Sequence, residues 1–367
     1  MLRVGVLGAG QLGRMLALAG YPLGLRFRFL DPAEEAPAEH LAERVQAAFD
    51  DEQALLSFAR GLDVVTFEFE NVPVRTLDFL ARHVPVQPSP QALATGQDRL
   101  HEKQFFQRVG IPVPPFYPVN SRSDLDDALR HIGFPAMLKT RQLGYDGKGQ
   151  APLRGPEDVG PAWNQLGGQP LLLEQLVAFE AEMSILAARS PAGDLAVYPL
   201  VENEHGGGIL RRSHVPAPHA TPELQRTAEG YARAALEALD YVGMVAIEFF
   251  LANGVLLGNE MAPRVHNSGH WTIEGAACSQ FENHLRAICG YPLGSTELVG
   301  ESIMYNLIGT VPLVEELLAI PGLHLHLYGK AARPARKLGH VTLVATSHRD
   351  LERAEARLRT LLFGAKE

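Results

Sequence analysis

The feature that most constrains the fold is a glycine-rich turn near the start of the chain. An apolar run over Arg3–Leu7 has the pattern of a buried strand, the sequence GAGQLG follows at residues 8–13, and a helical pattern continues to Ala19. A strand, a glycine turn and a helix in this order predict a parallel sheet with helices on its faces. With Asp31 after the next apolar run, the spacing also matches the dinucleotide-binding fingerprint. Because a helix N-terminus suits any phosphate, the ligand of this turn stays open at this point.

Composition narrows the functional classes. The chain has 367 residues and a net charge of −9, which argues against a double-stranded nucleic acid partner because phosphate binding needs a basic face. No apolar run approaches the roughly 18 residues of a membrane-spanning helix, and no charged leader precedes the first strand. Cys278 and Cys289 are too few for a disulfide framework and are expected to be thiols. We therefore expect a cytoplasmic protein with no nucleic-acid or membrane partner.

The order of apolar runs, prolines and glycines divides the chain into three predicted domains of an α/β protein. Residues 1–98 alternate strand-like and helical patterns and end in the proline-rich Val84–Pro90, which predicts a Rossmann-like parallel-sheet domain. Residues 99–178 form a small central unit of helices and short strands. Residues 179–367 contain longer strands and are expected to form a mixed C-terminal domain.

A second glycine-rich segment lies in the central unit. Lys139 ends an apolar strand, glycines follow at positions 144, 147 and 149, and Lys148 stands between the last two. Glycines let backbone amides approach an anion, and the lysines supply positive charge, although the spacing is not that of a P-loop. From this pattern alone, a phosphate-binding loop and an ordinary hairpin tip remain equally open.

Two carboxylates lie in an otherwise apolar hairpin over Val245–Glu260. An ionised carboxylate inside an apolar strand is costly unless it is paired or binds a cation, and Glu248 and Glu260 stand one on each arm. Two such acids on adjacent strands form an oxygen site that suits Mg²⁺ with bound phosphates. If the two acids are directly opposite each other, the loop between the strands must contain an odd number of residues. We therefore expect a bulged loop of about three or five residues rather than a tight turn at Asn253-Gly254.

Several segments of the sequence together carry a resemblance to a known family. They are GYDGKGQ at residues 144–150, NEMAPRVHNSGHW at 259–271, YGKAARPARKLGH at 328–340, FEFENVP at 67–73 and DRL at 98–100. With them, the chain resembles the ATP-grasp superfamily and, within it, the 5-(carboxyamino)imidazole ribonucleotide synthase family. Ala262 departs from the wider superfamily, where many members have a metal-binding asparagine, and leaves Asn267 or water to complete the metal shell.

The resemblance implies the fold, the reaction and the ligands. The fold would be ATP-grasp, with an N-terminal Rossmann-like domain, a small central lid domain and a C-terminal mixed domain. The reaction would be that of a carbon–nitrogen ligase in purine biosynthesis. ATP phosphorylates bicarbonate to carboxyphosphate, and the amine of 5-aminoimidazole ribonucleotide captures its carbon, with release of ADP and phosphate. The expected partners are these small molecules, Mg²⁺ (or Mn²⁺ in its place) and a second copy of the chain in a homodimer.

The resemblance also implies a role for individual residues. The ATP contacts would be Arg99, Lys139, Gly144, Tyr145, Asp146, Gly147, Lys148, Gly149, Gln150, Glu174, Gln175, Leu176, Val177, Glu182, His205, Asn259 and Glu260. The metal ligands would be Glu248 and Glu260. The catalytic set would be Arg264, His266 and Asn267 around bicarbonate, with Asp146 as the candidate for handling the amine proton. The acceptor contacts would be Gln11, Leu12, Glu70, Asn71 and Tyr145, with Lys330 and Arg336 on its phosphate and Arg333 and Lys337 nearby.

On this assignment the first glycine turn faces the ribonucleotide acceptor. Asp31 then has no ribose to bind and is expected to be a solvated surface acid. In the basic segment 323–340, the leucines at 323, 325 and 327 alternate with polar residues, which predicts a half-buried strand. An arginine-rich surface hairpin is the alternative to an anion site there.

Three other functions remain as alternatives. A formate-dependent glycinamide ribonucleotide transformylase would share the fold and require formate in place of bicarbonate. A nicotinamide-dependent oxidoreductase would change the absorbance of its cofactor and consume no ATP. A non-catalytic ATP-binding scaffold would bind ATP and release no phosphate with any acceptor.

Overall fold

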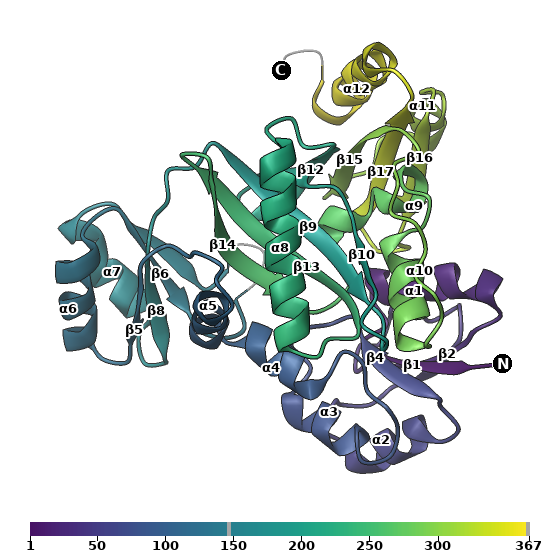
Figure 1. The fold of residues 1–367 in the computed structure, drawn as a ribbon, viewed down its shortest axis with the longest axis horizontal. Helices are drawn as coiled ribbons and strands as arrows, with labels where there is room; N and C mark the ends of the chain where they lie inside the picture. The colour runs from purple at the N-terminus through teal and green to yellow at the C-terminus, as the bar shows by residue number, and fades with distance from the viewer. Residues whose placement is uncertain (145–147, 365–367) are drawn as a thin grey trace.

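Three β-sheets form the framework of the computed structural model, which describes residues 1–144 and 148–364. In Figure 1 the N-terminal sheet lies at the lower right, a large sheet occupies the centre, and a small sheet lies at the left. Tyr145, Asp146 and Gly147, predicted as ligand contacts, lie outside the described residues.

The N-terminal sheet is parallel and has the strand order β3-β2-β1-β4. Its strands are β1 (Arg3–Leu7), β2 (Arg26–Leu30), β3 (Glu43–Val45) and β4 (Val64–Phe67), and its helices are α1 (Gln11–Gly20), η1 (Tyr21–Leu23), α2 (Glu52–Ala59), α3 (Val74–Leu80) and α4 (Pro90–Gln97). Because β2 and β4 flank β1 on opposite sides, the loops after β1 and β4 meet at a switch point, where α/β sheets place their ligands.

The small sheet is antiparallel, with the order β5-β8-β6-β7. It consists of β5 (Phe116–Val119), β6 (Ala136–Thr140), β7 (Gln150–Leu153) and β8 (Leu171–Gln175), with α6 (Arg122–Ile132) and α7 (Pro156–Leu166). The two helices form the outer layer in Figure 1, and Leu125, Val159 and Leu173 belong to the core between helices and sheet. The face of the small sheet that these helices do not cover is turned toward the centre of the molecule (Figure 1).

Helix α5 (Arg99–Arg108), expected as the start of the central domain, packs against the large sheet. Its Phe105 and Phe106 belong to the same core as Ile247 and Met261. Asp98 caps its first turn by accepting a hydrogen bond from Leu100 N at 3.0 Å. The helix is therefore fixed to the large sheet, and the separately packed small unit begins at β5.

The large sheet has the order β14-β13-β9-β11-β12-β15-β17-β16, with β10 beside β9, and all its pairs are antiparallel. The strands are β9 (Ala181–Arg189), β10 (Leu195–Val197), β11 (Val201–Gly206), β12 (Ile209–Val215), β13 (Gly243–Ala252), β14 (Val255–Ala262), β15 (Glu301–Ile308), β16 (Leu323–Leu327) and β17 (Lys337–Ala345). The helical segments are α8 (Pro222–Ala238), η2 (Asn267–Gly269), α9 (Thr272–Gly275), α10 (Gln280–Ile288), α11 (Val314–Leu318) and α12 (His348–Phe363).

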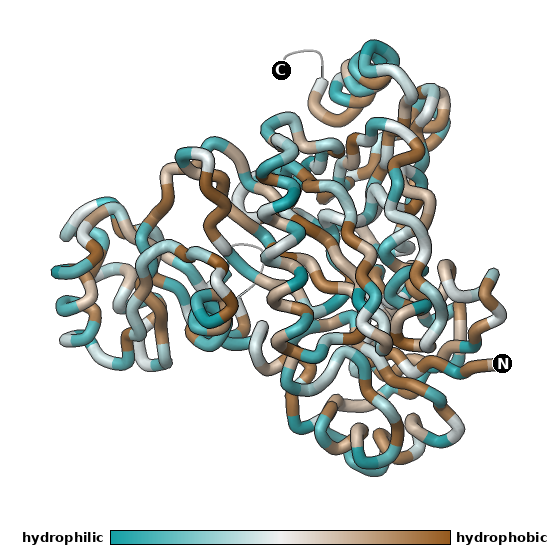
Figure 2. The backbone as a smooth tube through the Cα atoms, viewed as in Figure 1, coloured by the Kyte–Doolittle hydropathy of each residue, from teal (hydrophilic) through white to brown (hydrophobic). Residues whose placement is uncertain are grey.

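Two apolar cores lie on opposite faces of the large sheet. Along β13, Val245 and Ile247 pack with α8, whereas Met244 and Ala246 pack with α10. Such alternation places successive side chains on opposite faces. Figure 2 shows apolar stretches concentrated in the strands behind α8. Within the two described ranges, no helix is both long and apolar enough to cross a membrane.

The β13–β14 hairpin places Glu248 directly opposite Glu260, as the sequence predicts, but through a different turn. The expected loop of three or five residues is wrong: only Asn253 and Gly254, at φ 51° and 75°, join the strands. Positive φ at both positions matches the twist of a hairpin. The odd residue is taken up by a β-bulge at Asn259, beside the two acids.

Candidate active site

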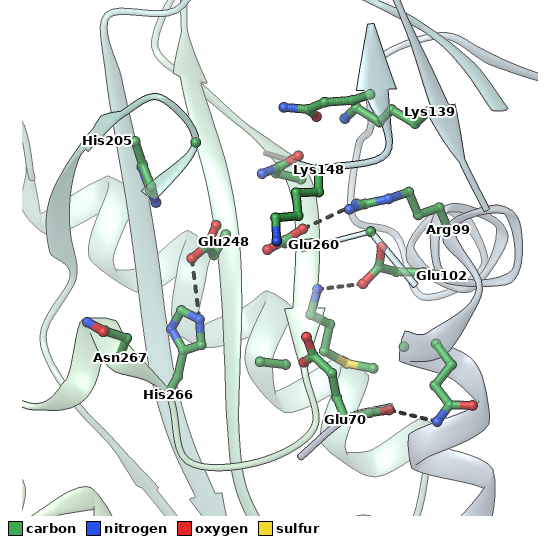
Figure 3. A pocket seen from close by; sticks show the side chains of 18 of the residues that line it. Glu70, Arg99, Glu102, Lys139, Lys148, His205, Glu248, Glu260, His266 and Asn267 are labelled. Atoms are coloured by element: carbon green, nitrogen blue, oxygen red, sulfur yellow. Dashed lines mark hydrogen bonds and ion pairs between the residues drawn. The ribbon is translucent and has the colours of Figure 1, made fainter. Parts of the chain in front are cut away.

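A cavity of about 730 Å³ lies between the three sheets and is lined by residues from each of them. Figure 3 shows its two facing acids, Glu248 and Glu260. Most of the predicted contacts line it, namely Gln11, Leu12, Glu70, Asn71, Arg99, Lys139, Gly144, Lys148, Gln150, Glu174, Gln175, Leu176, Val177, Glu182, His205, Glu248, Asn259, Glu260, Arg264, His266, Asn267 and Lys337. Gly149, Lys330, Arg333 and Arg336 are not part of its wall.

The two acids lie on the face of the sheet that α10 covers further along. Met244 and Ala246 pack into that core, and beyond them the same face of β13 opens to the cavity at Glu248 and Phe250. Arg99 Nη1 lies 3.2 Å from Glu260 Oε2, and His266 Nε2 lies 3.6 Å from Glu248 Oε1 (Figure 3).

The electrostatics of this pair differ between its members. Burial and the neighbouring Glu260 raise the pKa of Glu248 to about 8. Burial also acts to raise the pKa of Glu260, but Arg99 outweighs it, and the pKa falls below its usual value. Glu260 is therefore an ionised acid with a counter-ion, while ionisation of Glu248 brings a second negative charge that calls for a cation.

The donor set fits a hydrated divalent cation rather than a closed metal site. Among the described residues, no cluster of three or more His, Cys, Asp or Glu side chains is placed to hold a metal ion. Mg²⁺ is commonly bound through one or two carboxylates and completes its shell with water and substrate phosphates. The opposed Glu248 and Glu260 provide such a partial shell.

Lys139 belongs to a buried ion-pair network that sequence reasoning found only in part. Glu174 holds Lys139 Nζ at 2.5 Å on one oxygen and Lys103 Nζ at 2.5 Å on the other. Burial acts to raise the pKa of Glu174, but the two lysines lower it to about 2. Lys103 also donates to Gly258 O at 3.0 Å and thereby ties β8 to the bulge of β14. Glu174 therefore fixes Lys139 at the cavity wall.

One end of the cavity combines an aromatic pair with a carboxylate. Phe179 and Phe250 stack with their ring centres 4.9 Å apart, and Glu182 is the strand partner of Phe250. Glu182 Oε2 lies 2.7 Å from His205 Nδ1. Burial acts to lower the pKa of His205, but the hydrogen bond to Glu182 outweighs it and raises the pKa. An apolar surface beside a carboxylate suits a nucleoside, with the base on the rings and hydroxyls on the acid.

The predicted catalytic residues Arg264, His266 and Asn267 lie at the junction with the N-terminal sheet. Arg264 Nη2 donates to Glu70 Oε2 at 2.7 Å. Burial, and then the charge of Arg264, holds the pKa of His266 well below its usual value, so its imidazole is neutral. The side-chain nitrogen of Asn267 is buried with no hydrogen-bond partner in the described structure. A buried hydrogen-bond donor that has no partner in the protein is suited to donate to a bound ligand.

The basic segment reaches the glycine turn at one point. Lys330 Nζ lies 2.5 Å from Gln11 Oε1 and over the ring of Tyr328 at 5.7 Å. Leu323–Leu327 forms the predicted half-buried strand, β16. Arg333 is exposed, whereas Arg336 is half-buried and donates to Ala331 O at 3.2 Å.

Family models match three parts of the chain. A ribonucleotide synthetase preATP-grasp domain matches residues 1–97, an ATP-grasp domain matches 104–281, and a phosphoribosylaminoimidazole carboxylase C-terminal domain matches 302–354. The N5-carboxyaminoimidazole ribonucleotide synthase of Pseudomonas aeruginosa is 52% identical over 361 residues, which cover 98% of this chain and 99% of that protein. The chain belongs to the N5-carboxyaminoimidazole ribonucleotide synthase family.

Solved structures of the family have the same fold. The synthetase from Thermus thermophilus is 56% identical with a TM-score of 0.95, and the match covers 99% of both chains. The Aspergillus clavatus enzyme in complex with ADP and 5-aminoimidazole ribonucleotide is 33% identical with a TM-score of 0.90, covering 98% of this chain and 97% of that one. The family resemblance and the α/β ATP-grasp fold class are therefore confirmed, and the transformylase and oxidoreductase alternatives are not favoured.

This member of the family also contains site residues that sequence reasoning missed. Glu102 is buried, accepts a hydrogen bond from Met261 N at 2.6 Å, and has its pKa raised to about 8 by burial and then by Glu260. Gln97 donates to Glu70 O at 2.7 Å and so holds the loop after β4. Glu102 could have been suspected from its place on a helix that begins with a predicted ATP contact, whereas nothing local marks Gln97.

Asp31 corrects an expectation about the glycine turn. It is not a solvated surface acid, because it is half-buried and accepts a hydrogen bond from Ala9 N at 2.7 Å. The amide of Ala9 follows the end of β1, and Asp31 follows the end of the neighbouring strand β2. Asp31 therefore accepts a hydrogen bond that this amide would otherwise donate to water. Asp31 therefore stabilises the turn itself.

Proposed function

We propose that this chain catalyses the ATP-dependent carboxylation of 5-aminoimidazole ribonucleotide by bicarbonate, with formation of N5-carboxyaminoimidazole ribonucleotide, ADP and phosphate. The observation that carries the proposal is one cavity in which the opposed Glu248 and Glu260 lie beside Lys139 and beside the Arg264–Asn267 segment. A related enzyme has been solved with ADP and 5-aminoimidazole ribonucleotide, which supports the same pair of ligands here.

In this proposal ATP lies between the small sheet and the large one. Phe179, Phe250 and Leu176 offer an apolar surface to the adenine, and Glu182 offers an acceptor to the ribose. Lys139 and Lys148 provide positive charge for the phosphates. Glu248 and Glu260 would hold Mg²⁺, which screens the phosphate oxygens during transfer. The other predicted ATP contacts in the cavity wall would complete the nucleotide site; they are Arg99, Gly144, Gln150, Glu174, Gln175, Val177, His205 and Asn259. The domain proposed at 99–178 would act as a lid between those at 1–98 and 179–367, through its separately packed part from β5 onward.

Bicarbonate would bind between Arg264 and Asn267. The guanidinium and the unpartnered amide can both donate to its oxygens, and neutral His266 can accept a hydrogen bond from its hydroxyl. A bicarbonate oxygen then attacks the γ-phosphorus, and ADP leaves. The amine of the acceptor attacks the carbon of carboxyphosphate, the carbon–oxygen bond to phosphate breaks, and the amine proton passes to a base, for which Asp146 is our candidate.

The acceptor ribonucleotide would lie along the loops after β1 and β4. Gln11, Leu12, Glu70 and Asn71 line the cavity there and can bind its ribose. Lys330, which contacts Gln11, belongs to the basic segment 323–340. Lys330 and Arg336 would bind the 5′-phosphate, and Arg333 and Lys337 would add positive charge nearby. Tyr145 completes the proposed contacts.

Phosphate release from ATP tests this function directly. We expect release to require both Mg²⁺ and bicarbonate and to rise when 5-aminoimidazole ribonucleotide is added, with stoichiometric formation of the carbamate. Release that requires formate and glycinamide ribonucleotide would support the transformylase instead. Absence of release under every combination would leave a nucleotide-binding scaffold.

Two further parts of the proposal concern the state of the protein in the cell. We propose that it works as a homodimer in the cytoplasm, in keeping with a biosynthetic enzyme whose substrates are small soluble metabolites. Light scattering across a concentration series measures the mass directly, and a monomer at micromolar concentration would contradict the dimer.

A further inference from the structure

The glycine turn at residues 8–13 is occupied by a carboxylate from the neighbouring strand. Glu68, the first residue after β4, accepts hydrogen bonds from Gly10 N at 2.8 Å and from Gly13 N at 3.3 Å. A Cβ added to Gly8 would lie 2.7 Å from Glu68 Oε1, and one added to Gly10 would lie 2.6 Å from it. Gly8, at φ 96°, has a left-handed backbone conformation that favours glycine, and at both positions a Cβ would displace the Glu68 carboxylate from the turn.

A second acid takes another amide of the same turn. Asp31 accepts from Ala9 N at 2.7 Å and from Ala33 N at 2.8 Å. In dinucleotide-binding folds, amides at this helix N-terminus face the pyrophosphate. Here the amides of Ala9, Gly10 and Gly13 are all donated to the chain's own carboxylates.

The charges around the turn disfavour an external phosphate. Burial raises the pKa of Glu68, and the hydrogen bonds from Gly10 and Gly13 and the charge of Arg264 act against that rise. These contacts favour the ionised form, as a helix N-terminus does. A phosphate placed beside Glu68 and Asp31 would meet two acids where a dinucleotide-binding turn offers free donors.

We propose that Glu68 is a specificity-determining residue whose carboxylate takes the place of a ligand phosphate at the glycine turn. The turn then presents the side chains of Gln11 and Leu12 to the cavity, instead of its amides. Gln11 contacts Lys330, so the orientation that Glu68 imposes extends to the basic segment. The proposal rests on the proposed function only for the identity of the acceptor.

Binding of inorganic pyrophosphate tests the replacement. With saturating ADP on the nucleotide site, pyrophosphate is expected to raise the melting temperature of Glu68→Ala more than that of the unchanged protein, because the vacated amides can then bind it. Glu68→Gln keeps a carbonyl oxygen near Gly10 N and is expected to behave like the unchanged protein. Glu43→Ala, which removes an exposed acid from β3 of the same sheet, is the matched control.

Steady-state kinetics test the positioning of Gln11. In Glu68→Ala, kcat/KM for the ribonucleotide is expected to fall about tenfold, in line with the loss of a hydrogen bond to a charged group, while KM for ATP stays within about twofold. Glu68→Gln is expected to recover most of this loss. If Glu68 had only a structural role, Glu68→Ala would impair the use of both ATP and the ribonucleotide, and Glu68→Gln would not restore the ribonucleotide kinetics selectively.

The outcomes are separable. A melting temperature that pyrophosphate raises equally in Glu68→Ala and in the unchanged protein would overturn the proposal, as would equal losses toward ATP and the ribonucleotide. If Glu68→Ala does not fold, Glu68→Ser leaves the same amides open beside a small hydroxyl and is judged by the same two criteria. The pyrophosphate measurement needs no catalysis, so a failure of the proposed function would show itself separately, as absence of bicarbonate-dependent phosphate release.

Discussion

The two glycine-rich segments of this protein look alike in sequence and differ in what surrounds them. At residues 8–13 the backbone amides are taken by Glu68 and Asp31. At the second segment, Gly144 and Lys148 line the cavity beside Lys139, and Gly149 is at φ 71°. Glycine spacing therefore specifies a backbone shape, and the charges brought to it decide whether that shape binds the protein's own acid or an external anion.

The same contrast divides the cavity into two ends. The end proposed for the nucleotide contains the cations Lys139 and Lys148 and the two opposed glutamates. The end proposed for the acceptor contains the glycine turn held by Glu68 and Asp31, with Arg264 and Lys337 in the cavity wall and Lys330 beside Gln11. If this division holds, substitutions at one end should spare the substrate of the other.

The largest expected effect comes from Glu260→Gln, which removes one of the two acids at the nucleotide end. We expect phosphate release to fall by about a hundred- to a thousandfold. The reason is that Mg²⁺ would lose a carboxylate ligand and no longer be held where it screens the negative charge of the transition state. The melting temperature without ligands should change little. Glu204→Gln, an exposed acid on β11, is the control. Near-normal turnover in Glu260→Gln would refute the metal assignment.

A pair of substitutions tests the division between the two ends. Lys139→Ala is expected to reduce kcat/KM for ATP about ten- to a hundredfold and to spare the ribonucleotide, and Arg336→Ala is expected to do the reverse. Steady-state kinetics with each substrate varied in turn gives both values. Weaker ATP use in Arg336→Ala, with the ribonucleotide unaffected, would exchange the two assignments. Loss of both with a lower melting temperature would mean that the basic segment is only a structural hairpin.

A smaller effect is expected from pH in the metal-free protein. The folded state raises the pKa of Glu248 from 4.5 to about 8, so the folded protein keeps a proton that the unfolded chain has lost. Stability from this group is present below about pH 4.5 and is lost as the pH rises through about 8. Mg²⁺ with ADP should therefore stabilise the protein more as the pH rises over this range.

Thermal unfolding with and without Mg²⁺ and ADP measures this dependence. In the metal-free protein, Glu248→Gln should reduce the loss of stability with rising pH without abolishing it, because Glu102 also has a pKa raised to about 8 and contributes with the same sign. A slope of stabilisation that Glu248→Gln leaves unchanged would show that Glu248 is not the titrating group.

Sequence reasoning succeeded where the relevant contacts are local. The strand, turn and helix at residues 3–20 follow from periodicity. The opposition of Glu248 and Glu260 was inferred from the cost of two acids in an apolar hairpin. The hairpin also shows the limit of numbering. An odd loop and a two-residue turn with a bulge both place the acids opposite each other, and only the twist of the strands selects the second.

The missed residues act over long sequence separations. Glu68 meets Gly10 across 58 positions, and Lys103 meets Gly258 O across 155. Neither acid nor lysine stands in a pattern that names its partner. Asp31 was misjudged for the same reason, because its partner Ala9 belongs to a turn whose geometry the fold sets.

We propose that one cavity activates bicarbonate with ATP and passes its carbon to an amine. Bicarbonate labelled with heavy oxygen tests it most directly, because the oxygen that attacks the γ-phosphorus stays with phosphate when the amine captures the carbon. Mass spectrometry of the released phosphate should find one labelled oxygen per molecule, formed in step with the carbamate. Phosphate that carries no label, with its new oxygen drawn from water, would contradict the account.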